Sequence, residues 1–223
     1  MENSNMNNKP SDLKNWAYET IKRSILNSEM NAGDQLRIES LAEQLEISRT
    51  PIREALLKLE SEGLVRSASR VGFFVRGLTK HDLQELFELR EILESYAAEK
   101  AAEHVDEQDV QRLGEFQERA AKAISAGNMS EFMAMEVEIH SLILKKAGNS
   151  RLMKMLESIK DLIQRERMLS LQSPENIEES FKEHQVVINL LKKKDAKMAG
   201  KMMRSHILAV KERMLAFLEL PEE

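Results

Sequence analysis

Residues 48–65 read SRTPIREALLKLESEGLV, a helix whose beginning and end are both marked in the sequence. Ser48 suits the N-cap, and Pro51 falls in the first turn, where a missing N–H is tolerated. Gly63 suits the position just after the last turn, where the backbone is often left-handed. Between them, apolar residues recur at the spacing of one helix face: Ile52, Ala55, Leu56 and Leu59. The stretch therefore predicts a short helix with one buried face and one exposed face.

The residues around this helix predict a winged helix-turn-helix domain over residues 13–78. Two amphipathic stretches, about 13–28 and 38–45, precede it and predict two further helices. LVRSASRVGFFV, residues 64–75, follows it and predicts two short strands around a polar tip. Three helices and a two-stranded ribbon in this order describe that DNA-binding fold. The polar residues 1–12 are predicted to be disordered.

The exposed start of the third helix is the candidate DNA-reading surface. In this fold the third helix enters the major groove, where arginine is the commonest reader of guanine edges. A helix N-terminus also attracts phosphate, and an arginine at the wing tip is placed to reach phosphate or the minor groove. The DNA contacts predicted from these positions are Ser48, Arg49, Thr50, Arg53 and Arg70.

Residues 79–220 predict a second, all-helical domain. Thr79 suits the N-cap of its first helix, with Asp82 as the capping partner three residues later. The expected helices run over about 79–102, 106–126, 130–147, 150–172, 175–193 and 195–218. The connections are short, so consecutive helices are expected to be antiparallel neighbours. The predicted fold is mainly α: an N-terminal winged helix-turn-helix and a C-terminal antiparallel helical bundle.

Five polar residues of this second domain stand where the helical pattern calls for apolar ones: Arg90, Glu136, His140, His184 and His206. A buried polar group without a partner costs roughly 2–7 kcal/mol, so inward polar groups on separate helices are expected to meet. Glu136 and His140 share a helix face at i, i+4, and His184 and His206 lie at similar distances from the turn between their helices. Three imidazoles and a carboxylate suit Zn²⁺, Ni²⁺ or Mn²⁺. The alternative is that each histidine is a core residue with its own partner.

The composition is that of an ordinary globular protein, with 42% hydrophobic and 32% charged residues. There is no cysteine, so disulfides and thiolate metal sites are excluded. The N-terminus lacks the apolar core of a signal peptide, and no apolar run approaches the roughly 18 residues of a membrane span. We therefore expect a cytoplasmic protein that does not contact a membrane. The net charge of −5 lies wholly after residue 78, because the first 78 residues hold 11 basic and 11 acidic side chains.

Several of these segments together resemble a family of bacterial transcription regulators. SRTPIREALLKLESEGLV and the wing RVGFFV resemble the DNA-reading segment of the GntR family. LTKHDLQELFELREILESYAAEKAA resembles the start of the helical ligand domain of that family's FadR branch, the FCD domain. MEVEIHSLILKKAGNSRL and EHQVVINLLKKKDAKMAGKMMRSHI are similar to later segments of the FCD domain. The resemblance covers about residues 13–218.

The resemblance implies a homodimer bound to a palindromic DNA operator, with a small organic acid as effector. The family's DNA contacts carry over to Arg49, Thr50, Arg53 and the wing Gly72. In metal-binding FCD domains an acid and three histidines hold a divalent ion, which implies Glu136, His140, His184 and His206 here. Arg90 matches an arginine that lies near the effector pocket of the family.

Three places depart from the family's pattern. Glu136 replaces the usual aspartate, so its carboxylate reaches one methylene further and the metal preference stays open. Glu46 stands where the helix-turn-helix turn usually has glycine, and a left-handed backbone there would cost roughly 1 kcal/mol. Ile38 and Glu39 replace a Glu-Arg pair, so a phosphate contact is expected to be absent.

These observations predict a ligand-responsive transcription regulator and not an enzyme. We expect a repressor whose operator binding is modulated by a small carboxylate at the metal site, with Arg90 as a second anchor. One alternative is a metalloenzyme that activates water at an open metal position, although no catalytic residue is assigned beside the site. The other is a DNA-binding protein with a purely structural metal, whose operator affinity would not depend on an effector.

Overall fold

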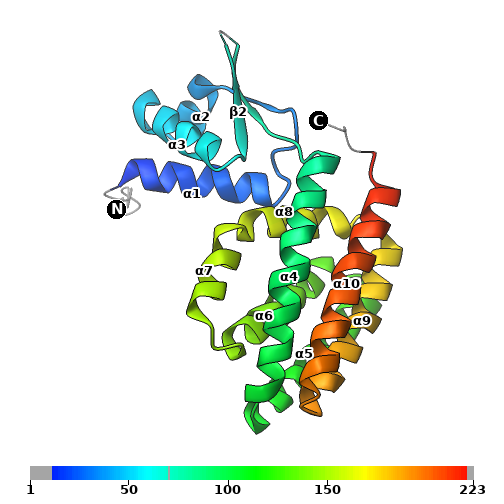
Figure 1. Ribbon diagram of the computed structural model, residues 1–223. Helices are drawn as coiled ribbons and strands as arrows, with labels where there is room; N and C mark the ends of the chain where they lie inside the picture. The colour runs from blue at the N-terminus through cyan, green and yellow to red at the C-terminus, as the bar shows by residue number, and fades with distance from the viewer. Residues whose placement is uncertain (1–11, 70, 220–223) are drawn as a thin grey trace, which may run out of the picture. The chain divides into compact units, whose positions relative to one another are not determined.

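The computed structural model describes residues 12–69 and 71–219, and the chain divides after Leu78 into two compact units. The predicted disordered stretch up to residue 11 and the predicted DNA contact Arg70 lie outside the described residues. The described residues form ten helices and one small sheet (Figure 1). The predicted class, mainly α with a winged helix-turn-helix followed by a helical domain, is confirmed.

The first unit contains three helices and three strands: α1 (Leu13–Leu26), β1 (Gln35–Leu36), α2 (Ile38–Gln44), α3 (Arg49–Ser61), β2 (Val65–Ala68) and β3 (Gly72–Val75). The sheet has the order β1-β3-β2 and all its pairs are antiparallel. β2 and β3 are the predicted wing. β1 was not predicted, because two residues are too few to show an alternating pattern.

Two local details of this unit follow from single residues. Glu46 has a φ of 52°, so the turn between α2 and α3 does adopt the left-handed backbone that glycine would adopt without strain. Asp12, which was predicted to be disordered, instead caps α1 by accepting a hydrogen bond from the Asn15 amide at 2.9 Å. Ser48 occupies the N-cap position of α3, but its side chain makes no capping hydrogen bond.

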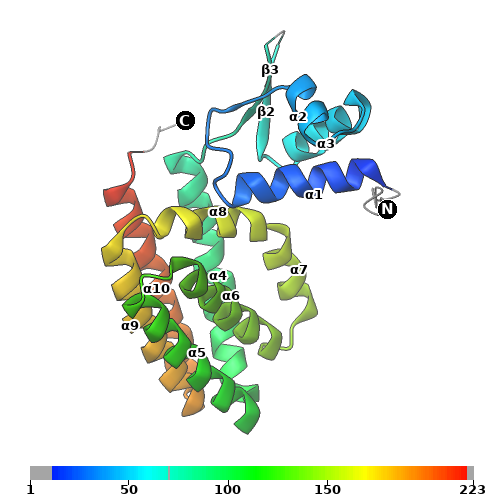
Figure 2. The same cartoon turned by 180° about the vertical axis from the view of Figure 1, so that it is seen from behind.

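The second unit contains seven helices: α4 (Lys80–His104), α5 (Glu107–Ser125), α6 (Met129–Lys146), α7 (Ser150–Ser158), α8 (Lys160–Ser170), α9 (Pro174–Lys192) and α10 (Ala196–Phe217). α10 runs antiparallel to both α4 and α9, and these helices lie side by side in both views (Figures 1 and 2). The predicted capping box at the start of α4 is present, with Thr79 and Asp82 bonded to each other's amides at 3.0 Å. The predicted helical bundle is confirmed, but consecutive helices are not all neighbours, because α4 packs mainly against α10 rather than against α5.

The expected continuous helix over 150–172 is wrong, because Ile159 divides it into α7 and α8. No glycine or proline marks this break. The buried residues on either side, Leu156 and Ile163, are seven apart, which is also the spacing of one continuous helix face. The sequence pattern therefore could not reveal it. Among the described residues, no helix combines the length and apolarity needed to cross a membrane.

Candidate metal and effector site

Three histidines from three helices meet in the core of the second unit. His140 comes from α6, His184 from α9 and His206 from α10, and all three side chains are buried. Nε2 of His140 lies 3.1 Å from Nε2 of His184. One ring nitrogen from each residue lies within 4.8 Å of the others. The ring centroids of His184 and His206 are 4.3 Å apart. The structure therefore brings together the three imidazoles that the sequence placed on separate inward faces.

Carboxylates hold the opposite nitrogen of two of these rings. Oε2 of Glu94 lies 2.5 Å from Nδ1 of His140, and Oε2 of Glu183 lies 2.6 Å from Nδ1 of His206. A carboxylate at Nδ1 fixes the ring orientation and keeps the proton on that nitrogen, which leaves Nε2 with a free electron pair. Two of the three rings therefore point a basic nitrogen toward the centre of the cluster.

Burial keeps these two imidazoles uncharged. It lowers the pKa of His140 to about 3, with the positive charge of Arg167 acting in the same direction and Glu94 opposing it. Burial likewise lowers the pKa of His206 to about 4, although the hydrogen bond that His206 donates to Glu183 opposes it. A neutral imidazole nitrogen is the form that binds a metal ion. The imidazole nitrogens therefore fit a divalent transition metal. Because the rings are buried and two of them are held by carboxylates, these ligands would keep a fixed geometry.

Glu136, the predicted fourth ligand, lies at the edge of the cluster. Its Oε1 is 2.7 Å from Nδ1 of His184, but the two atoms are not aligned as a hydrogen bond, and that nitrogen has no hydrogen-bond partner among the described residues. Among the described residues, the group of donors close enough to share one ion contains the three imidazoles without Glu136. In this arrangement Glu136 lies against Nδ1 of His184, outside the group of three converging imidazoles.

Arg90, the predicted effector anchor, is fully engaged by protein carboxylates. Its Nε donates to Oε1 of Glu94 at 2.6 Å, and its Nη1 lies 2.5 Å from Oε2 of Glu166. All three side chains are buried. Burial alone would raise the pKa of Glu94, but Arg90, His140 and Arg167 together hold it well below its usual range. Glu166, Arg90 and Glu94 thus form a connected chain of ion pairs from α8, and Glu94 links this chain to the neutral imidazole of His140.

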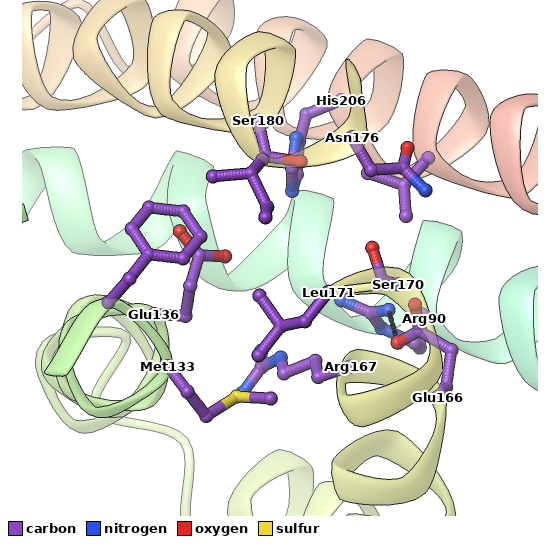
Figure 3. Close-up of a pocket in the computed structure, with 13 residues that line it drawn as sticks. Arg90, Met133, Glu136, Glu166, Arg167, Ser170, Leu171, Asn176, Ser180 and His206 are labelled. Carbon is purple, nitrogen blue, oxygen red and sulfur yellow. Dashed lines mark hydrogen bonds and ion pairs between the residues drawn. The ribbon is translucent and has the colours of Figure 1, made fainter. Parts of the chain in front are cut away.

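A small cavity beside the cluster holds about 30 Å³, the room of about one water molecule. Figure 3 shows Arg90, Glu136, Arg167, Asn176 and His206 around it. Asn176 accepts from Nε of Arg213 at 2.6 Å, and its buried Nδ2 has no partner among the described residues. Arg167 makes no hydrogen bond or ion pair within the described part of the chain. The cavity wall therefore presents two hydrogen-bond donor groups that the protein leaves unused.

The sequence analysis missed several of these residues. Glu94, Glu183 and Arg167 occupy positions at which a charged residue on a helix is usually solvent-exposed. Glu94 had a usable signal, because it stands four residues after the inward Arg90 and so shares its face. Arg167 and Glu183 had none in the apolar pattern.

The predicted DNA-contacting residues of the first unit are all exposed where the structure describes them. Arg49, Thr50 and Arg53 lie on the solvent side of the start of α3, together with Ser48. Nη1 of Arg49 lies 3.4 Å from Oε1 of Glu39 on α2, and both side chains are more than 60% exposed. Such a pair contributes little and leaves Arg49 free to reach a DNA base.

The wing lies on the same hollow surface as α3. Gly72, at the start of β3, has a φ of 121°, which favours glycine. It lines one surface hollow together with Arg53 and with Arg37, which precedes α2. Nε of Arg37 donates to Gln35, and Gln35 donates to the wing carbonyl of Val71. Arg37 is a further exposed cation of this surface that the sequence analysis did not single out.

Two family models match the chain, one for each unit. The model described as bacterial regulatory proteins, gntR family, matches residues 13–75, and the model of the FCD domain matches residues 85–209.

Proteins with related sequences are transcription regulators. The uncharacterized HTH-type transcriptional regulator YdhC of Bacillus subtilis (strain 168) is 31% identical over 202 residues, which cover 90% of this chain and 88% of the relative. The gluconate operon transcriptional repressor of Bacillus licheniformis is 26% identical over 180 residues, which cover 78% of this chain and 74% of the relative.

Solved structures share the fold. A GntR transcriptional regulator from Rhodococcus sp. RHA1 aligns with a TM-score of 0.77 at 17% identity, covering 92% of this chain and 99% of that one. McbR/YncC of E. coli aligns with a TM-score of 0.70 at 24% identity, covering 93% of this chain and 97% of that one. At these identities the likeness is one of fold.

Proposed function

Because the chain belongs to the GntR family of bacterial transcription regulators and carries an FCD domain, we propose that a small carboxylate and a divalent metal ion in its second unit modulate its binding to DNA. The chain is a DNA-binding transcription regulator, and its families and relatives are regulators and not enzymes. The proposal concerns what controls it.

The observation that carries the proposal is the convergence of ring nitrogens in the histidine cluster. Nε2 of His140 and Nε2 of His184 are 3.1 Å apart, and two nitrogens bound to one ion at about 2.0–2.1 Å are separated by a similar distance. A hydrogen bond between two neutral imidazoles accounts for this contact as well, but it leaves the convergence of the third imidazole, His206, unexplained. The carboxylates at the opposite nitrogens are the arrangement that metal-bound histidines usually have.

We assign His140, His184 and His206 as the protein's ligands, with Glu136 as a fourth ligand or as the orienting partner of His184. Zn²⁺, Ni²⁺ and Mn²⁺ all accept imidazole and carboxylate ligands. When bound, the ion would supply a Lewis-acidic position for the carboxylate of an effector. The DNA side of the proposal is a homodimer on a palindromic operator, because two-fold protein symmetry is mirrored in two half-sites.

We further propose that the protein represses transcription, in line with the name of the gluconate operon transcriptional repressor. A purely structural metal is the remaining alternative. It predicts the same metal content but an operator affinity that no acid changes. The unused donors at the cavity wall, Arg167 and Asn176, favour a site that also binds an anion.

The test is metal content measured by native mass spectrometry on protein without a histidine tag. We expect a homodimer with one divalent ion per chain for the wild type, and loss of the ion in His184→Ala. His81→Ala is the matched control, because His81 is exposed and lies beside Glu85, outside the cluster. Full metal occupancy in His184→Ala, or a metal-free wild type after incubation with excess Zn²⁺, would refute the metal site. A monomer with and without DNA would refute the homodimer.

A further inference from the structure

A second and larger cavity lies on the other side of Arg167. It has a volume of about 220 Å³, and His140, Glu94 and Arg167 line one part of its wall. Most of the remaining wall is apolar and includes Ala97, Ile143, Leu144, Leu156, Ile163 and Met203. We call this cavity the apolar chamber. The chamber therefore combines a polar end beside the histidine cluster with an apolar body.

The break between α7 and α8 helps to form this chamber. Leu156 near the end of α7 and Ile163 in α8 both line it, and both are largely buried. Ile159, between them, departs from helical geometry with a φ of −114°. The one irregularity that the sequence pattern did not predict in this unit is thus located at the chamber wall.

Arg167 is the natural anchor for an anion at the polar end of the chamber. Of the residues that line the two cavities, Arg167 is the one they share. Burial, with the positive charge of Arg90, lowers the pKa of Arg167 from its usual value, so the surroundings disfavour its charge. Arg90 is already paired with Glu94 and Glu166, whereas Arg167 has no ion-pair partner in the described residues. The half-buried guanidinium of Arg167 can therefore form charge-assisted hydrogen bonds with a carboxylate ligand.

We propose that the effector is a monocarboxylic acid with an apolar tail, its carboxylate on Arg167 beside the histidine cluster and its tail in the apolar chamber. This inference rests on the proposed function, because it names the class of acid that the site would bind. An apolar cavity of about 150 Å³ holds a benzene molecule, so this chamber has room for a phenyl group or an alkyl chain of about six to eight carbons. A second carboxylate in the tail would lose hydration against the apolar wall unless it reached Lys160, a cation that also lines the chamber.

The test is isothermal titration calorimetry on the full-length protein with two series of acids. Butyrate, hexanoate and octanoate carry apolar tails, and succinate, adipate and suberate carry a second carboxylate at the same lengths. Each series is measured on Zn²⁺-loaded and on metal-depleted protein. We expect the affinity of the first series to rise roughly fourfold per methylene until the chamber is full, and the second series to bind at least tenfold more weakly than the first at equal length.

Two kinds of variant separate the anchor from the chamber. Arg167→Gln is expected to weaken octanoate and butyrate alike, by tenfold or more. The same substitution at Arg151, which is exposed on α7 and lines neither cavity, is the matched control. Ala97→Leu fills part of the chamber and is expected to weaken octanoate by more than tenfold while leaving butyrate unchanged. Val137→Phe, at the more exposed edge of the chamber, repeats this test if Ala97→Leu does not fold.

The outcomes distinguish this inference from the proposed function. Metal-dependent binding of dicarboxylates, with no gain along the monocarboxylate series, overturns the apolar chamber and leaves the proposed function standing. The expected series on metal-depleted protein upholds the chamber and overturns the role of the metal. If no acid of either series binds the Zn²⁺-loaded protein, both fall.

Discussion

The two units of this chain carry their functional residues in opposite ways. In the first unit Arg49, Thr50 and Arg53 project into solvent from a helix whose other face is the core. In the second unit Arg90 and the three histidines are themselves part of the core. An exposed side chain needs no protein partner because water solvates it, whereas a buried polar side chain needs one. The first site can therefore be altered one residue at a time, and the second behaves as a network.

The largest expected effect is on stability, and it tests whether the second unit depends on its buried network. Replacing Glu94 by glutamine removes one of the two carboxylates on Arg90 and the one on His140. We expect Glu94→Gln to lose about 3–5 kcal/mol in the free energy of unfolding, measured in urea, because it leaves a buried charge incompletely paired.

The matched control is Glu39→Gln, which removes the exposed partner of Arg49. It should change the free energy of unfolding by no more than about 0.5 kcal/mol. Similar small losses in both variants would contradict the contrast between the two units.

The second expected effect is a dependence of stability on pH that originates in the buried histidines. The folded pKa values of His206 and His140, about 4 and about 3, lie below the unfolded reference of about 6.5. Their contribution is complete above pH 6.5 and is lost as the pH falls toward 4, because the unfolded chain then binds more protons than the folded one. In metal-free protein, each imidazole should lower the free energy of unfolding by on the order of 3 kcal/mol over this pH range.

The measurement is the free energy of unfolding at several pH values, for the wild type and for His206→Gln. The variant should show a smaller slope between pH 6.5 and 4.5. The unperturbed histidine pKa alone predicts that stabilisation by the metal fades below about pH 6.5. Because the folded pKa values are lower, we expect this stabilisation to persist to more acidic pH. An abrupt loss of metal stabilisation at pH 6.5 would argue against neutral buried imidazoles.

The third expected effect is on DNA binding and leaves stability unchanged. Arg49→Ala and Arg53→Ala should each weaken operator binding by roughly 1–3 kcal/mol, the usual value of a bidentate base contact. Gel-shift titration at fixed salt, with an operator selected from random duplexes, measures this. Arg151→Ala in the second unit is the control. Unchanged affinity in either α3 variant would remove that arginine from the DNA surface.

The smallest expected effect comes from a single backbone position. Glu46 adopts a left-handed conformation, so Glu46→Gly should raise the free energy of unfolding by about 0.5–1 kcal/mol through relief of strain. Glu46→Ala keeps the strained backbone and removes only the carboxylate, so it separates the two contributions. A glycine variant no more stable than the alanine variant would show that this turn stores no strain.

The accuracy of the sequence analysis differed between elements for physical reasons. Helices with a cap and an apolar stripe were predictable, as at Thr79 and in α3. β1 and the break at Ile159 were not, because a two-residue strand has no period and the apolar face continues across the break. Inward histidines were visible as exceptions within apolar stripes.

The partners of those histidines were not visible, because a glutamate on a helix is ordinarily solvent-exposed. Glu183 had no signal in the sequence and Glu94 had only its spacing of four residues from Arg90, so the fold was needed to show that both contact the histidines. Arg167 was missed for the same reason, and Arg90 was assigned to the effector because its two carboxylate partners could not be seen from the sequence.

The buried charges around the histidine cluster have a consequence for the order of binding. Glu94, Glu136 and Glu166 face two guanidinium groups, Arg90 and Arg167, while Glu183 is balanced by Arg213. Burial raises the pKa of Glu166, but with this carboxylate ionised beside Arg90 and with neutral imidazoles the cluster has one negative charge in excess, which attracts a cation and repels an anion. A divalent ion reverses that sign, and a single carboxylate then restores electrical neutrality. If the proposed site is correct, these charges favour an order in which the metal binds first and a monoanion, rather than a dianion, completes the site.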